Sequence, residues 1–88
     1  MSATMVQRIE QTLRDAFAPE SLAVDDESAA HAGHAGAGGG GHYRVRVVSS
    51  RFAGMSPVAR HRAVYALFAA ELRGEIHALA IDARAPGE

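Results

Sequence analysis

The sequence predicts a small α+β domain: a three-stranded mixed sheet with helices on one of its faces. Two segments carry apolar residues at helical spacing, three alternate apolar with polar residues, and together they follow the order helix, strand, strand, helix, strand. A strand that passes through a helix into another strand favours a parallel pair with a right-handed crossover. The 88 residues suffice for one modest core, so we place a single domain at residues 1–88.

The first helix is expected at residues 5–18. Thr4 followed by Gln7 has the form of a capping box, in which each side chain bonds the backbone N–H of the other residue. Apolar residues then recur at helical spacing until Pro19, which cannot continue a helix. The sequence therefore predicts a helix of about four turns with one apolar face.

Two strands are expected to flank a glycine-rich loop. Leu22 and Val24 alternate with polar neighbours, which predicts a short strand. Residues 28–41 then hold six glycines, five alanines and two histidines, with no side chain large enough to anchor a core, so we expect a flexible loop. Residues 42–49 alternate again and predict a strand with one buried face.

A second helix and a last strand complete the predicted fold. Ser56 is a suitable N-cap, Pro57 suits the first helical position, and Gly74 suits the end, which predicts a helix over residues 57–73, about 25 Å long. Residues 75–83 form the last predicted strand. One face of that strand is expected to carry His77, Leu79 and Ile81.

Charge is distributed unevenly along the chain. Residues 42–74 hold six arginines and one acid, a balance of +5, whereas residues 1–41 hold two arginines and six acids, a balance of −4. All basic residues are arginine, which forms fork-like contacts with carboxylate and phosphate, although a composition bias of the source genome explains this equally well. The middle of the chain is therefore a candidate basic surface.

The composition also restricts the location and the chemistry. Cysteine is absent, so no disulfide is expected, and no apolar run approaches the ~18 residues of a membrane span. We expect a cytoplasmic protein that does not enter a membrane. No arrangement of nucleophile, base and acid is visible, and the serines stand where strand ends and caps explain them, so we expect no enzyme and no catalytic residue.

Five histidines without a cysteine suggest half of a metal site. His31 in the glycine-rich loop and His77 in the last strand could be brought together by the fold. On the residues alone, a solvated loop histidine and a strand-edge histidine bonded to a carbonyl are the commoner roles. His31 and His34 also form an H-x-x-H pair, which without cysteines is a weak zinc signal. His42 reads as a rim or packing residue.

Several motifs in order resemble the BolA family, and the similarity extends from about Ile9 to Pro86. The resemblance implies a type II KH-like fold with the element order predicted above. The motifs are Glu27-Ser28 followed by His31, Gly41-His42-Tyr43-Arg44-Val45, Val48-Ser49-Ser50-Arg51-Phe52-Ala53-Gly54, Arg60-His61-Arg62 and Ile76-His77-Ala78-Leu79-Ala80-Ile81.

The resemblance also implies a partner and a shared cofactor. BolA-like proteins pair with monothiol glutaredoxins and share a [2Fe-2S] cluster, for which glutaredoxin and glutathione supply two thiolates. The BolA-like chain supplies a histidine near the start of its last strand, here His77, and a loop ligand, here His31 with His34 as substitute. The isolated chain is then expected to carry no cofactor and to be a monomer or a weak dimer.

An alternative function is that of a nucleic-acid-binding transcriptional regulator, which the KH-like resemblance also implies. A basic surface suits phosphates, but it equally suits an acidic protein. The Gly-x-x-Gly loop by which KH domains clamp a nucleic-acid backbone is absent between the core helices. The residues assigned to this nucleic-acid or partner surface are Arg44, Arg46, Arg51, Arg60, His61 and Arg62.

Overall fold

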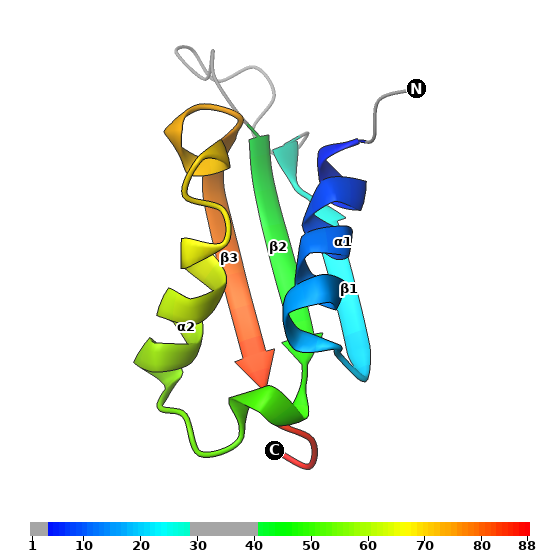
Figure 1. The fold of residues 1–88 in the computed structure, drawn as a ribbon. Coiled ribbons are helices and arrows are strands. Elements are labelled where there is room, and N and C mark those ends of the chain that lie inside the picture. Colours follow the sequence, from blue (N-terminus) through cyan, green and yellow to red (C-terminus); the bar gives the residue numbers. More distant parts are fainter. Residues whose placement is uncertain (1–3, 29–40) are drawn as a thin grey trace.

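The computed structural model describes residues 4–28 and 41–88, and these follow the predicted order of elements (Figure 1). Helix α1 (Met5–Phe17) and strand β1 (Ser21–Asp26) come first. Strand β2 (Gly41–Val48), helix α2 (Pro57–Ala66) and strand β3 (Ile76–Arg84) follow, with the short 3₁₀ turns η2 (Ser50–Phe52) after β2 and η3 (Glu71–Arg73) before β3.

The three strands form one mixed sheet in the order β1-β2-β3, as predicted. β1 pairs with β2 antiparallel, and β2 pairs with β3 parallel. Helices α1 and α2 lie on the same side of the sheet (Figure 1). Because β2 and β3 run in the same direction, their first residues lie at the same end of the sheet, next to each other.

The core lies between the helices and the sheet. The capping box of Thr4 and Gln7 is confirmed: the Gln7 backbone nitrogen lies 3.1 Å from Thr4 Oγ1, and the Thr4 nitrogen lies 3.0 Å from Gln7 Oε1. This capping box marks the start of α1. One face of that helix is buried. Each large apolar side chain in the core stabilises the fold by ~1.5–3 kcal/mol. The buried apolar residues are Ile9, Leu13, Val45, Val47, Phe52, Val64, Phe68, Ile76, Leu79 and Ala85.

The second helix is shorter than predicted, since α2 ends at Ala66 and the prediction of a helix to residue 73 is wrong. The Leu67 and Phe68 nitrogens donate three residues back, to Val64 and Tyr65, so the chain leaves α-helical geometry there. This tighter path carries the Phe68 side chain into the core, where it is 1% exposed. Burial of Phe68 therefore outweighs the helical pattern.

Candidate metal-binding corner

His77 lies at an irregularity in the pairing of β2 with β3. Gly41 faces Ile76 and His42 faces Ala78, so His77 is an extra residue opposite the junction of Gly41 and His42. Such a bulge interrupts the alternation of side chains and redirects one of them. Ile76 is 1% exposed and Leu79 is 7% exposed, whereas His77 is exposed. The prediction that His77 shares a face with Leu79 and Ile81 is therefore wrong.

The rings of His42 and His77 lie side by side at this end of the sheet. Their centroids are 5.0 Å apart and their planes are inclined by 43°. His42 is half-buried and His77 is exposed. The parallel pairing of β2 with β3 is the cause, because it aligns the starts of two strands that each have a histidine as their second residue. We call this pair the histidine corner.

Hydrogen bonds fix the chain on both sides of residues 29–40. Ser28 Oγ accepts from the backbone nitrogen of His42 at 3.1 Å, and the Glu27 nitrogen donates to the His42 carbonyl at 2.7 Å. Asp26 Oδ1 accepts from the Ser28 nitrogen at 2.9 Å, and its bonds with Ser28 lower the pKa of Asp26. The segment containing His31 and His34 thus leaves and rejoins the described chain beside His42. Both of those predicted ligands lie outside the described residues.

Gly41 and Tyr43 lie beside the contact between Ser28 and His42. We call the region of these four residues the neck. A β-carbon on Gly41 would lie 2.7 Å from both Ser28 Oγ and the ring of Tyr43, so only glycine fits there without a shift. The Gly41 nitrogen also donates to the Glu75 carbonyl at 3.0 Å, which joins the start of β2 to the residues before His77. Burial, followed by the charge of Asp26, raises the pKa of Tyr43. The phenol therefore stays neutral near pH 7.

Arg8 supports the corner from α1. Its Nη1 lies 2.8 Å from Glu75 Oε2, and its Nη2 lies 3.4 Å from Glu71 Oε2. The hydrogen bond from Arg8 lowers the pKa of Glu75. The two carboxylates stand on either side of the turn that leads into β3, so Arg8 anchors the chain two residues before His77. The sequence contained no signal for this contact across 67 residues.

The predicted basic residues are distributed over several elements. Arg44 Nε lies 3.1 Å from Glu27 Oε2 and Arg46 Nη2 lies 3.4 Å from Asp25 Oδ2, so both sheet arginines have carboxylate partners. Arg51 donates to the carbonyl of Ala16.

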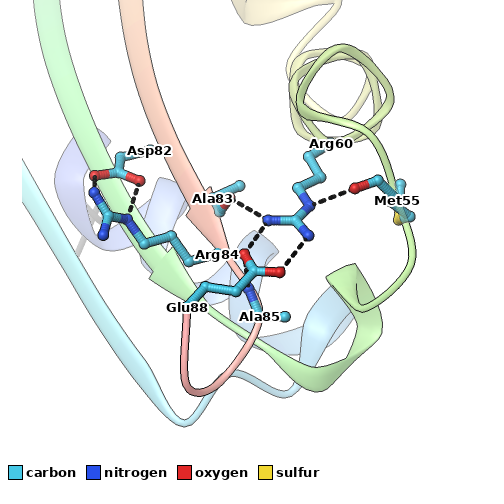
Figure 2. Close-up of polar contacts among 7 residues, drawn as sticks. All are labelled: Met55, Arg60, Asp82, Ala83, Arg84, Ala85 and Glu88. Carbon is cyan, nitrogen blue, oxygen red and sulfur yellow. Dashed lines mark hydrogen bonds and ion pairs between the residues drawn. The ribbon is translucent and has the colours of Figure 1, made fainter.

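Arg60 and its neighbours occupy α2. The Arg60 side chain is only 11% exposed and donates to the Glu88 carboxylate and to the carbonyls of Met55 and Ala83 (Figure 2). His61 and Arg62 are exposed, and the His61 ring stacks on Tyr65 with centroids 5.0 Å apart. Arg60, one of the six residues predicted for the surface, is thus directed into the fold and does not form part of that surface.

The histidine corner offers two imidazoles and no thiolate. Among residues 4–28 and 41–88, no group of three or more histidine, cysteine, aspartate or glutamate side chains is placed to hold a metal. Imidazole pairs are nonetheless a known ligand set for one iron of a [2Fe-2S] cluster. The donor set therefore fits half of such a site.

The helices within the described ranges are not long and apolar enough to span a bilayer.

The contact between His42 and His77 was not predicted, because the sequence analysis considered His42 alone, as a rim or packing residue. Two features together could have revealed it: the predicted parallel alignment of the second and third strands, and a histidine near the start of each.

Comparison with known proteins gives consistent matches. The family model for BolA-like protein matches residues 13–88. The human protein BolA-like protein 1 is 50% identical over 80 residues, which cover 91% of this chain and 57% of the human protein. The Vibrio cholerae protein named DNA-binding transcriptional regulator BolA is 52% identical over 73 residues, covering 83% of this chain and 67% of that protein.

A solved structure agrees with the fold. BolA1 from Arabidopsis thaliana superposes with a TM-score of 0.84 at 34% identity, over 99% of this chain and 98% of the other. The similarity thus extends over both helices, all three strands and the corner where β2 and β3 begin. The chain spans little more than half the length of the human relative.

Proposed function

This chain belongs to the BolA-like protein family, and from that premise we propose that it is a non-catalytic adaptor that shares a [2Fe-2S] cluster with a monothiol glutaredoxin. The carrying observation is the exposed imidazole of His77, redirected by a bulge to lie beside His42. The chain has no cysteine, so its contribution is imidazole, and glutaredoxin with glutathione supplies the thiolates. A cytoplasmic location is part of this proposal.

The second imidazole comes from His31 in this proposal, with His34 as its substitute. The neck formed by Ser28 and His42 supports this choice, because the segment bearing both histidines starts and ends at the corner. His31 is the third residue after Ser28, and a fully extended chain of three residue steps spans about 10–11 Å. The corresponding limit for His34 is about 20–22 Å. Chain length therefore keeps both histidines within these distances of Ser28, which is bonded to His42, the neighbour of His77.

Imidazole ligands suit a role in cluster transfer or iron and redox sensing. A bound [2Fe-2S] cluster supplies one-electron chemistry, and its potential becomes less negative when neutral ligands replace anionic thiolates. The residues around the corner keep His77 accessible: it is exposed, while Ile76 beside it is buried and fixes the strand. A partner can thus approach the imidazole without unfolding the sheet.

Reconstitution with the partner tests this proposal. The chain is mixed with a monothiol glutaredoxin, glutathione, iron and sulfide, and the visible absorption and circular dichroism of the complex are compared with those of glutaredoxin alone. We expect a distinct spectrum that is lost in His77→Ala and unchanged in His61→Ala, which removes an exposed histidine from α2. A spectrum that survives His77→Ala, or no complex at all, contradicts the proposal.

Nucleic-acid binding is the second candidate, and two observations favour it. The Vibrio cholerae relative is named a DNA-binding transcriptional regulator, and Arg62 on α2 stands next to the exposed stack of His61 on Tyr65. Against it, Arg44 and Arg46 are paired with carboxylates and Arg60 is directed inward. Of the six residues predicted for this surface, Arg51 and Arg62 are the exposed arginines without a carboxylate partner in the described ranges, so a surface for phosphates would rest on these two.

A salt titration of duplex DNA binding tests the second candidate. Binding through several arginines releases counterions, so affinity must fall steeply as salt increases. Arg62→Gln should weaken binding, whereas Arg14→Gln on α1 should leave it unchanged. The absence of measurable binding at low salt removes this candidate.

A further inference from the structure

The outer edge of β3 is open for pairing with another strand. Among the described residues, β3 has a neighbour on one side only, because it is last in the order β1-β2-β3. The Arg84 carbonyl accepts from the Ser49 nitrogen at 2.9 Å, so the backbone groups of Arg84 face β2. Because these groups alternate in direction along a strand, those of Leu79 and Ile81 face away from β2. Neither residue has another backbone bond in the described ranges.

Both ends of this edge are protected, but its middle is not. Native edge strands avoid pairing by bulges, charged side chains or covered backbone groups. At the start of β3 the register shifts by one residue. At its end, Arg60 Nη1 lies 3.3 Å from the Ala83 carbonyl oxygen, and Asp82 pairs with Arg84 (Figure 2). Between them, residues 78–81 read Ala-Leu-Ala-Ile, with no charge and no proline.

A groove runs along this edge between β3 and α2. It has a volume of about 390 Å³, and the residues that line it include Pro57 and His61 of α2 and both Ile81 and Asp82 of β3. Pro57, His61 and Tyr65 follow at a spacing of four, so they lie in one row of the helix. Tyr65 is 38% exposed, and its ring stacks on that of His61. One wall of the groove is thus largely apolar and aromatic.

This row of α2 matches the unprotected edge in length. From Pro57 to Tyr65 a helix rises about 12 Å, which equals about four residues of a strand. α2 runs opposite to β3 (Figure 1), and the contact between Arg60 and Ala83 joins the start of α2 to the end of β3. The far end of the row therefore lies near Leu79.

The charge of α2 favours an acidic occupant. This helix carries two arginines and His61 but no acid. Arg60 is paired with Glu88, whereas Arg62 has no carboxylate partner in the described ranges. An acidic chain is therefore complementary to this wall. The N–H and C=O groups of the edge also match another peptide backbone, whereas the sugar-phosphate backbone of DNA has no N–H donor.

We infer that the outer edge of β3 binds an extended acidic peptide of a partner protein as a fourth strand of the sheet. The backbone of the peptide pairs with Leu79 and Ile81, and apolar side chains at alternate positions pack against His61 and Tyr65. This inference goes beyond the proposed function, because it involves neither His77 nor a cluster.

A short synthetic peptide of alternating valine and glutamate is the probe, added to the full chain without glutaredoxin. NMR follows the amide signals and their hydrogen exchange. We expect saturable binding that protects the Leu79 and Ile81 amides, whereas the Ala80 amide, which faces β2, is protected in both states. The same peptide with all its backbone nitrogens methylated keeps the side chains but cannot donate to the edge, so it should not bind.

Two variants of the chain test the charge of the wall, and circular dichroism verifies that both are folded. His61→Glu should weaken binding of the peptide by up to about 5-fold, the effect of a single exposed charge. Gln11→Glu, which adds the same charge to an exposed position on α1, should leave binding unchanged.

Several results would overturn the inference. They are the absence of saturable binding, binding that the methylated peptide retains, and equal binding by both variants. Protection of the two amides that grows with chain concentration without peptide would assign the edge to a second copy of this chain. Protection by oligothymidylate but not by the peptide would assign the groove to nucleic acid. Since glutaredoxin is absent, failure of cluster sharing leaves each result unaffected.

Discussion

Arg60 and Glu88 form a charged pair that ties the end of the described chain to α2. Arg60 Nη2 lies 2.7 Å from Glu88 Oε2, and the same guanidinium donates to the carbonyls of Met55 and Ala83 (Figure 2). Glu88 also accepts from the backbone nitrogen of Ala85. One arginine thus joins the start of α2, the end of β3 and the turn that follows it.

This pair predicts a pH dependence of stability. The hydrogen bond from Arg60, followed by that from the Ala85 nitrogen, lowers the pKa of Glu88 from its ordinary 4.5 to about 2. A carboxyl whose pKa is lower in the folded state stabilises the fold above pH 4.5, and this contribution is lost as the pH falls to about 2. Glu88→Gln should therefore be less stable than the unmodified chain near pH 7 but equally stable near pH 2.

Urea unfolding at several pH values measures the difference. Glu20→Gln is the matched control, because Glu20 is an exposed carboxyl with no ion pair in the part of the chain that the structure describes. A Glu88→Gln deficit that stays constant down to about pH 2 would mean that the carboxylate charge is not the cause.

Gly41→Ala should destabilise the neck beside the histidine corner. The added methyl would lie 2.7 Å from Ser28 Oγ and from the Tyr43 ring, and crowding of this kind costs about 1–3 kcal/mol of unfolding free energy. The His42 ring signals in NMR should shift as well, since Ser28 bonds the His42 nitrogen. Gly74→Ala is the control, because no atom lies within 4 Å of its added methyl. Equal unfolding midpoints for the two variants would contradict the account.

Ser49→Ala should reduce the free energy of unfolding, although it removes only one heavy atom, the hydroxyl oxygen. Ser49 is fully buried, its Oγ donates to the Phe17 carbonyl at 2.6 Å, and it accepts from the Arg51 nitrogen at 3.1 Å. Both partners would lose a bond, at a cost of about 1–3 kcal/mol in unfolding free energy. The neighbouring exposed Ser50→Ala serves as control in the same urea titration. A loss no greater than that of Ser50→Ala would show that water replaces the hydroxyl.

Arg8→Gln should disturb the segment before His77. The variant loses the bonds to Glu71 and Glu75, so thermal unfolding should begin at a lower temperature. Because the pair is partly exposed, the difference should shrink as salt increases. The His77 ring signals should shift in Arg8→Gln and remain in place in Arg14→Gln, whose partner is the nearby Glu10. Unchanged His77 signals would exclude a supporting role for Arg8.

The element order was predictable because it follows from local patterns. The capping box at Thr4 and the Ser56 cap are both present, and the parallel crossover follows from a general preference. The end of α2 at Ala66 was not predictable, since no glycine or proline marks it and the cause is the burial of Phe68 in the folded core.

The site was predictable only in part. The family resemblance singled out His77, but the exposure of that residue depends on a bulge, and a bulge depends on the register between two strands. The partners of the arginines were equally hidden, because Arg60 and Glu88 are 28 residues apart and Arg8 and Glu75 are 67 apart. Composition counts charges without showing which of them pair.

The most direct measurement of the central claim is the hyperfine spectrum of the reduced cluster in the complex with glutaredoxin, prepared with ¹⁵N-histidine only in this chain. If the chain supplies His77 and a loop histidine to the shared cluster, the electron spin must show couplings to two ¹⁵N nuclei, and His77→Ala, which loses the shared cluster, must show none. A reduced cluster without any ¹⁵N coupling, with ligands entirely from glutaredoxin and glutathione, would contradict the claim.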